Sequence, residues 1–415
     1  MFESGSRLEA IVETGGAGSE VLAYFRDRER DESCVFAPDR GGGWRCFPKL
    51  RGIVVGFTDS ACTSPIYGCP DCTPGDRQVT VAVSGCASPT AVPHELTPAP
   101  KPPFVLALNG ICVPIVAPPD TYFTAAPLDD APYVVGTFED RDVGTGLGAR
   151  SLVTADGARE MHHGYALSDR RSCTFLGGPG QSHPCLPGTP ARTELGLVYF
   201  YETDGCTTRI AHSPRSEDCE PTTHVGIDGE ARTLVREVTA PAFERSPVDS
   251  SCSATRQDFR FWEIGTRDET LPTAELITIG EGAAKPVYYA AFGSPIEFAN
   301  RWVDAQNHTC LPTETIRGRR CLPPAISLPT EGSWADPQCT SELVYNPEEV
   351  THAVRFDGGM VGSVHPLTRY YGSEVYVRLG EQCTLLSEPA TRLSHVGASV
   401  DLAGLPELTF QPAGS

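Results

Sequence analysis

A short segment in the middle of the chain holds the residues best suited to acid–base chemistry. The run Met161-His162-His163-Gly164-Tyr165 reads as a strand, and alternate residues of a strand face the same side, so His163 and Tyr165 would lie together. A histidine and a tyrosine can serve as base and acid when a proton is removed from a sugar acid, the chemistry of polysaccharide lyases. A surface strand with a half-buried tyrosine is the alternative. The sequence favours it, because aromatic residues occupy the same region of the other repeats.

A second cluster of polar and aromatic residues lies near the C-terminus. The run from His365 to Tyr371 contains a histidine, an arginine and two tyrosines. Aromatic rings beside an arginine suit contact with a carbohydrate or a peptide, although they also suit packing within a sheet. The residues predicted to bind are therefore His365, Arg369, Tyr370 and Tyr371.

The segment Cys69-Pro70-Asp71-Cys72 has the CxxC spacing of zinc knuckles and dithiol oxidoreductases. The chain has 16 cysteines, an even number, and most of them recur in register along the sequence. This pattern favours structural disulfides over a metal site, and Cys69 could pair with Cys86 as an extra local bridge. We therefore expect no metal centre at this CxxC.

Aspartates recur beside the repeated cysteines. A threefold set of carboxylates at one end of the molecule could bind a cation such as calcium. Turn capping is favoured instead, because aspartate accepts backbone N–H bonds locally and no complete calcium-binding loop is present. We therefore expect no cofactor, and calcium is the one alternative left open. The aspartates concerned are Asp27, Asp169, Asp304, Asp59, Asp204 and Asp336.

The cysteines define a threefold internal repeat. Arg45–Pro48, Pro184–Pro187 and Arg320–Pro323 are three versions of one tetrapeptide, and each contains a cysteine with a partner 12, 12 or 11 residues upstream. This spacing predicts three hairpin disulfides, Cys34 with Cys46, Cys173 with Cys185, and Cys310 with Cys321. Two further cysteines follow in each unit, and their pairing cannot be deduced from order alone. The repeat units are expected at 1–142, 143–272 and 273–415.

The fold class follows from short strand-like runs separated by glycine-rich turns, with almost no helical periodicity. We expect an all-β protein of about 24 to 30 strands, which a single open sheet cannot accommodate. A closed β-propeller, with six blades favoured, would give the pseudo-threefold symmetry. The alternative is three tandem β-sandwich domains. The proline-rich stretch 87–103 is expected to be a long surface loop.

The composition restricts the partners and the compartment. With 53 acidic and 33 basic residues the net charge is −20, which argues against nucleic acid as a partner. No apolar run approaches the length needed to span a bilayer. The cysteine content indicates an oxidising compartment, whereas the first residues lack the features of a signal peptide. Secretion would then require a leader absent from this sequence.

The repeated motifs resemble those of a known group of proteins. The tetrapeptides, their upstream cysteines and the aromatic-x-x-x-x-Cys-Thr segments at 57–63, 201–207 and 334–340 are similar to those of uncharacterised cysteine-rich secreted proteins or lipoproteins of large-genome predatory bacteria. The resemblance covers nearly the whole chain. It implies a location in the envelope or outside the cell, and it implies no activity. The second unit departs from the pattern at Pro184, which argues against three identical sites.

Together these features predict a secreted or surface-anchored binding protein that recognises a glycan or an extracellular protein. One alternative is a secreted carbohydrate-active enzyme, either a glycoside hydrolase or a lyase that uses His163 and Tyr165. Another is a structural component of the envelope. An enzyme should gather its polar residues in one cleft, whereas a binding protein should present a broader surface.

Overall fold

A computed structural model describes the chain apart from residues 50–52, 70–71, 83–89, 107–111, 115–121, 145, 177–181, 189–190, 196–197, 215–222, 228, 240, 246–250, 256–258, 329–332, 347–349, 358, 372–373, 380–381, 386–392 and 414–415. The described residues form 39 β-strands and one short 3-10 turn, Leu402–Gly404, and they contain no α-helix. The expectation of an all-β protein is confirmed. No helix in this part of the chain is long and apolar enough to cross a membrane.

The described strands include three frames of five antiparallel strands each, which lie within residues 8–144, 147–278 and 284–412. The first frame comprises β2 (Leu8–Thr14), β3 (Glu20–Asp27), β4 (Glu32–Pro38), β5 (Trp44–Pro48) and β13 (Val135–Gly144). The second comprises β14 (Leu147–Thr154), β15 (Arg159–Ala166), β16 (Cys173–Phe175), β17 (His183–Pro187) and β26 (Thr273–Thr278). The third comprises β27 (Ala284–Ala291), β28 (Ser294–Asp304), β29 (Thr309–Thr315), β30 (Gly318–Leu322) and β39 (Thr409–Pro412). The short strand β1 (Phe2–Glu3) pairs with β15.

The fifth strand of each frame joins it to the next frame. β13 pairs with β14, β26 with β27, and β39 with β2. An equivalent backbone hydrogen bond of 2.9 Å recurs in the three frames, from the amide of Cys46, Cys185 or Cys321 to a carbonyl just before the fifth strand. The sequence repeat is therefore also a repeat of strand pairing.

A module is inserted between the fourth and fifth strands of each frame. Module 1 contains β6 (Ile53–Phe57), β7 (Pro65–Gly68), β8 (Arg77–Ala82), β9 (Thr90–Pro98), β10 (Phe104–Leu106), β11 (Cys112–Pro114) and β12 (Tyr122–Pro127). Module 2 contains β18 (Glu194–Leu195), β19 (Val198–Tyr201), β20 (Ile210–Pro214), β21 (His224–Ile227), β22 (Glu230–Val238), β23 (Phe243–Arg245), β24 (Cys252–Ala254) and β25 (Phe259–Arg267). Module 3 contains β31 (Ala325–Ser327), β32 (Ser333–Trp334), β33 (Glu342–Tyr345), β34 (His352–Asp357), β35 (Met360–Arg369), β36 (Tyr376–Leu379), β37 (Gln382–Leu385) and β38 (Leu393–Val396).

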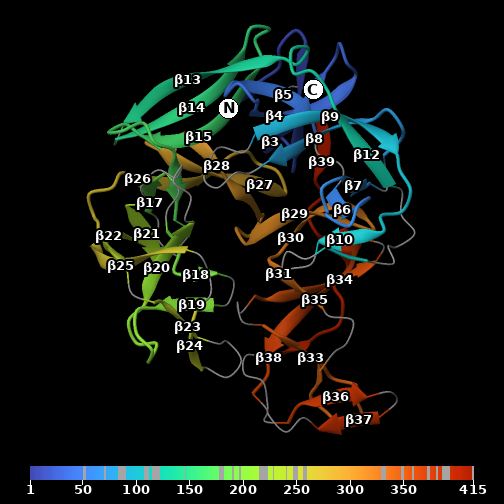
Figure 1. Ribbon diagram of the computed structural model, residues 1–415, viewed down its shortest axis with the longest axis vertical. Helices are drawn as coiled ribbons and strands as arrows, with labels where there is room; N and C mark the ends of the chain where they lie inside the picture. The colour runs from blue at the N-terminus through green and yellow to red at the C-terminus, as the bar shows by residue number, and fades with distance from the viewer. Residues whose placement is uncertain are drawn as a thin grey trace.

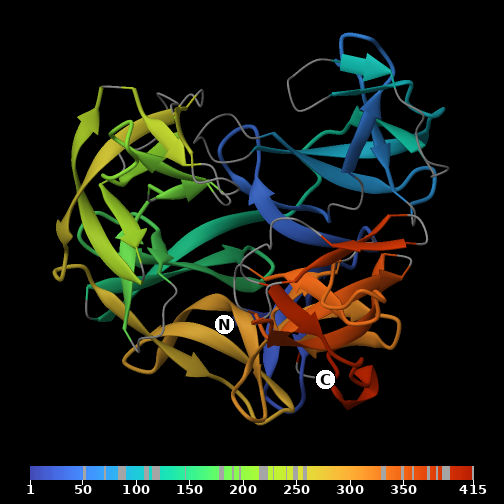
Figure 2. The same ribbon diagram turned by 90° about the horizontal axis from the view of Figure 1, so that it is seen from below.

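The three modules share one topology. Module 1 has the strand order β11-β10-β6-β7-β12-β9-β8, and module 3 repeats it as β37-β36-β32-β33-β38-β35-β34. In module 2 the same order is split into two sheets, with a single bridge between Tyr201 and Arg209 at the split. Figures 1 and 2 show the modules, coloured blue to cyan, yellow-green and orange to red, as separate bodies around the frames.

This arrangement corrects the expectation of a propeller. A propeller blade is a separate sheet of consecutive strands, whereas the frame strands described here continue from one unit to the next, in sheets of nine and fifteen strands. No propeller is formed by the described residues, and the several packed sheets are closer to the sandwich alternative. The proline-rich stretch also differs from expectation, because residues 90–98 form β9, which lies between β8 and β12.

Two kinds of disulfide hold each unit together. The hairpin disulfides predicted from the repeat are all present, with Cα–Cα distances of 5.2, 4.8 and 5.2 Å, and all six cysteines are buried in the frame cores. A second disulfide ties the first turn of each module to a later hairpin, joining Cys62 to Cys112, Cys206 to Cys252 and Cys339 to Cys383. The first cysteine of each pair has a positive φ, of 52°, 48° and 53°, which non-glycine residues rarely adopt. The module turns are thus copies of one local structure.

The three frames meet around a small central cavity. Leu22 of β3, Met161 of β15 and Phe298 of β28 line it, together with Tyr288 and Glu160. The cavity has a volume of about 160 Å³. One strand from each frame therefore contributes to the same apolar centre.

Candidate functional sites

The predicted acid–base pair lies on β15, where a β-bulge changes the alternation of side chains. Arg150 pairs with His163 and Ser151 with Met161, so His162 is an extra residue in the strand. As a result the two imidazole rings lie close together, with centroids 4.8 Å apart, and His162 also contacts the ring of Trp44 at 4.5 Å. Phe138 completes the cluster, 5.3 Å from His162.

Arg150 lies beside both predicted residues. Its guanidinium group forms two hydrogen bonds with Asp140, of 2.6 and 2.8 Å, and lies 5.2 Å from the ring of Tyr165. The Tyr165 ring packs on Gly148, because a Cβ atom added to Gly148 would lie only 2.2 Å from the ring. The structure therefore brings an arginine and a carboxylate to His163 and Tyr165.

Burial keeps this histidine pair uncharged. Desolvation lowers the pKa of His163 to about 4, and the positive charge of Arg150 adds to the effect. The pKa of His162 is also lowered to about 4, by burial and then by His163 and Arg150. The Nε2 atom of His163 is buried without a hydrogen-bond partner among the described residues. A neutral imidazole can accept a proton, but Asp140 already occupies the Arg150 donors that would bind a sugar carboxylate.

The second predicted set does not converge on one point. The ring nitrogens of His365 contact the Gly397 carbonyl and the Ser363 hydroxyl, each at 2.9 Å. The Tyr370 hydroxyl donates to a backbone carbonyl at 2.5 Å, so both side chains brace module 3. Arg369 and Tyr371 remain at the surface, with the guanidinium 5.7 Å from a ring that is 85% exposed. Of the four predicted residues, Arg369 and Tyr371 are the two that the structure leaves exposed.

The recurrent aspartates already accept hydrogen bonds in the turns where they lie. Asp59 accepts from the amides of Ala61, Thr63 and Ser64, and Asp336 accepts from three equivalent amides. In the second module Thr203 holds this position, since its carbonyl accepts the Cys206 amide, so Asp204 is not the equivalent residue. Within the described residues no group of three or more candidate ligands could hold a metal ion.

The CxxC cysteines are bonded to each other. Cys69 and Cys72 form a disulfide and are both buried, so this segment is a closed loop in module 1. The suggested pairing of Cys69 with Cys86 is therefore wrong, and Cys86 itself lies outside the described residues.

A recess between frame 1 and module 1, absent from the sequence-based predictions, has a strongly polar lining. It has a volume of about 430 Å³. We call it the basic recess, and its lining consists of Arg26, Arg30, Asp31, Glu32, Ser33, Pro48, Lys49, Gly75, Asp76 and Arg77. The alternation of basic and acidic residues from Arg26 to Glu32 is the sequence signal that could have indicated it.

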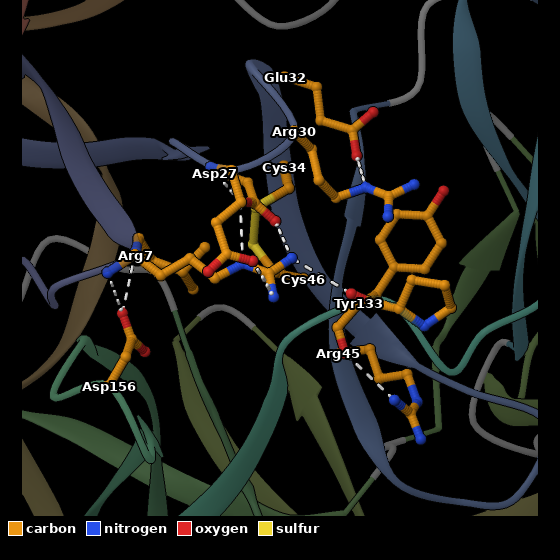
Figure 3. Close-up of polar contacts among 12 residues, drawn as sticks. Arg7, Asp27, Arg30, Glu32, Cys34, Arg45, Cys46, Tyr133 and Asp156 are labelled. Carbon is orange, nitrogen blue, oxygen red and sulfur yellow. Dashed lines mark hydrogen bonds and ion pairs between the residues drawn. A yellow bond between two sulfur atoms is a disulfide. The ribbon is translucent and has the colours of Figure 1, made fainter.

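The cations of the recess are fixed by acidic and aromatic neighbours. Glu32 is shared by two arginines, with the Arg30 Nε at 2.6 Å and the Arg77 Nη1 at 3.4 Å. The Arg30 guanidinium also stacks on Tyr133 at 4.4 Å, as Figure 3 shows, and Lys49 lies 5.1 Å above the ring of Tyr24. Cation–π contacts of this kind hold a charged group in place without neutralising it.

A buried ion pair anchors the strands beneath the recess. Arg7 donates to both carboxylate oxygens of Asp27, at 2.9 and 2.6 Å, and the Asp27 side chain is 1% exposed. The backbone amides of Arg7 and Leu8 both donate to Asp156 at 2.9 Å. In Figure 3 this network connects β2 and β3 with the turn that follows β14. The recess therefore lies on a rigid part of frame 1.

Fold and sites together define a triplicated, disulfide-rich all-β protein with a charged recess in its first unit. The chain belongs to a family of unknown function, DUF7481, whose model matches residues 2–265. The match extends from β1 to β25 and so includes the recess and the histidine pair. No curated protein and no solved structure is significantly similar to the chain.

Proposed function

We propose that this protein is a secreted or surface-attached binding protein that recognises a glycan or an extracellular protein through the basic recess. The observation that supports the proposal is a preformed polar opening of about 430 Å³, within the size range of sites for small ligands. The seven disulfides of the described residues suit an oxidising compartment.

Differences between the repeat units also support a role for the recess. Lys49 follows the frame tetrapeptide of the first unit, whereas Gly188 and Pro324 stand at this position in the other two. Arg77 begins β8, and the corresponding strands β21 and β34 begin with histidines. Features shared by all three units maintain the fold, so the basic residues found at these two positions in the first unit alone indicate a specialised role.

Retention of the oxidised protein on a panel of immobilised glycans and on envelope protein fractions tests this proposal. Retention on at least one ligand, weakened by substitution in the recess, is expected. Absence of retention on every ligand would overturn it.

A carbohydrate-active enzyme is the second candidate, because Arg150 and Asp140 lie beside His163 and Tyr165. The same purified protein should then depolymerise an acidic polysaccharide and release unsaturated uronates, and His163→Ala should abolish that activity. Because Asp140 occupies Arg150, we rank this candidate below binding.

A further inference from the structure

We infer that the basic recess binds the carboxylate or sulfate group of an acidic oligosaccharide, an inference that rests on the proposed binding function. The key feature is the charge balance around Glu32. The Glu32 carboxylate is paired with two guanidinium groups, those of Arg30 and Arg77. Lys49 forms no ion pair with any described residue and lies over an aromatic ring. These four groups hold two positive charges in excess, within a chain of net charge −20.

The remaining charges of the recess reduce this excess to one positive charge, because Arg26 and Asp31 cancel each other and Asp76 keeps its negative charge. Asp31 is paired with Arg26 at 2.5 Å, and Asp76 accepts hydrogen bonds from the amide and hydroxyl of Thr73. An anion placed between Lys49 and Arg77 would receive charge-assisted hydrogen bonds, which are about twice as strong as neutral ones. The chain as a whole carries a net charge of −20 and repels anions, so the recess offers a local site for one anionic group.

The lining favours a saccharide over a peptide. Nine of its ten residues are charged or are serine and glycine, and Pro48 is the only apolar side chain. A peptide bound with affinity normally buries apolar or aromatic anchors, and in this lining Pro48 alone offers such anchors an apolar side chain. A saccharide presents hydroxyl groups, which the remaining donors and acceptors of the recess can bind.

Calorimetric titration of the oxidised protein tests the inference with four probes of similar length. These are a tetrasaccharide of uronic acids, a sulfated tetrasaccharide, a neutral tetrasaccharide and a tetrapeptide of glutamate. The variants are Lys49→Gln and Arg77→Gln. Lys101→Gln is the matched control, because it removes one exposed positive charge from module 1 outside the recess. Unchanged thermal unfolding of each variant verifies that it is folded.

We expect at least one acidic tetrasaccharide to bind at least about tenfold more tightly than the neutral one. Each recess variant should weaken that binding by about tenfold, as expected for one lost charge-assisted contact, and Lys101→Gln should leave it unchanged. Added salt should weaken it as well.

Other outcomes separate this inference from the proposed function. Equal binding of neutral and acidic sugars that is insensitive to the recess variants would overturn the inference while leaving a glycan-binding protein. Binding of the glutamate peptide in place of every sugar would overturn it in favour of a protein partner. If no probe binds and no glycan or envelope fraction retains the protein, both proposals fail.

Discussion

Replacement of Glu160 by glutamine should make the protein more stable at alkaline pH while leaving it nearly unchanged at acidic pH. Glu160 lies on β15 and lines the central cavity together with Leu22, Met161 and Phe298 from the three frames. It keeps some accessible surface because it faces the cavity, yet protein atoms enclose it. Burial raises the pKa of Glu160 from 4.5 to about 7.

The raised pKa fixes the sign of the pH dependence. Between about pH 4.5 and 7 the folded state binds more protons than the unfolded state, so the contribution of Glu160 to stability falls as the pH rises through this window. Above pH 7 the folded state holds a buried carboxylate, at a cost of about 3 kcal/mol for a shift of this size. Glutamine has nearly the same shape and does not titrate, so Glu160→Gln removes this cost. Water within the cavity would reduce the gain, and about 3 kcal/mol is therefore its upper bound.

Urea unfolding of the oxidised protein at pH 5 and pH 8 measures the effect. The difference between Glu160→Gln and the unsubstituted protein should grow by about 2 to 3 kcal/mol from the lower pH to the higher. Glu281→Gln is the control, since Glu281 is exposed, and it should show no such growth. Equal effects of Glu160→Gln at the two pH values would refute the assignment of a buried, protonated carboxyl group at this position.

Three further predictions concern other parts of the fold. The pKa of His162 is lowered to about 4, so the folded state loses stability as the pH falls from 6.5 towards 4, and His162→Gln should reduce this loss in thermal unfolding scans. Arg7→Met leaves the buried Asp27 without its cation and should cost about 3 to 5 kcal/mol in urea unfolding, whereas a cost below about 1 kcal/mol would show that the pair is dispensable. Replacement of Cys62 and Cys112 by serine opens a loop of 50 residues and should destabilise module 1 by about 4 kcal/mol, visible as faster proteolysis within this module; cleavage spread evenly over the chain would contradict a local role.

The hairpin disulfides could be predicted from the sequence because their spacing recurs. Two cysteines 12 residues apart on either side of a turn can face each other across a hairpin, as Cys34 and Cys46 do. The pairing of Cys62 with Cys112 could not be predicted in this way, because 50 residues separate them and several strands intervene. Local geometry fixes the first kind of bond, whereas the second depends on the folded module.

The overall architecture and the recess could not be predicted from the sequence, for a related reason. The unit length was evident, but nothing in the sequence indicated that each module is inserted before the last strand of its frame. That strand pairs with a partner far away in the chain, as Val135 does with Arg45. The bulge at His162 could not be predicted either, because a single extra residue does not change the composition of a strand.

The triplication itself indicates where function resides. A residue three positions before the first cysteine of each unit has a positive φ, namely Asp31, Arg170 and Asn307, although the three side chains differ in charge. The backbone is thus maintained while the side chains have diverged. In modules 2 and 3 an arginine stacks on an aromatic ring, whereas the first module has no arginine at the equivalent position and combines with frame 1 to form the basic recess. A repeated scaffold in which Lys49 and Arg77 have no counterpart of the same charge in the other two units is suited to bind one partner in one orientation, which three identical sites would not achieve.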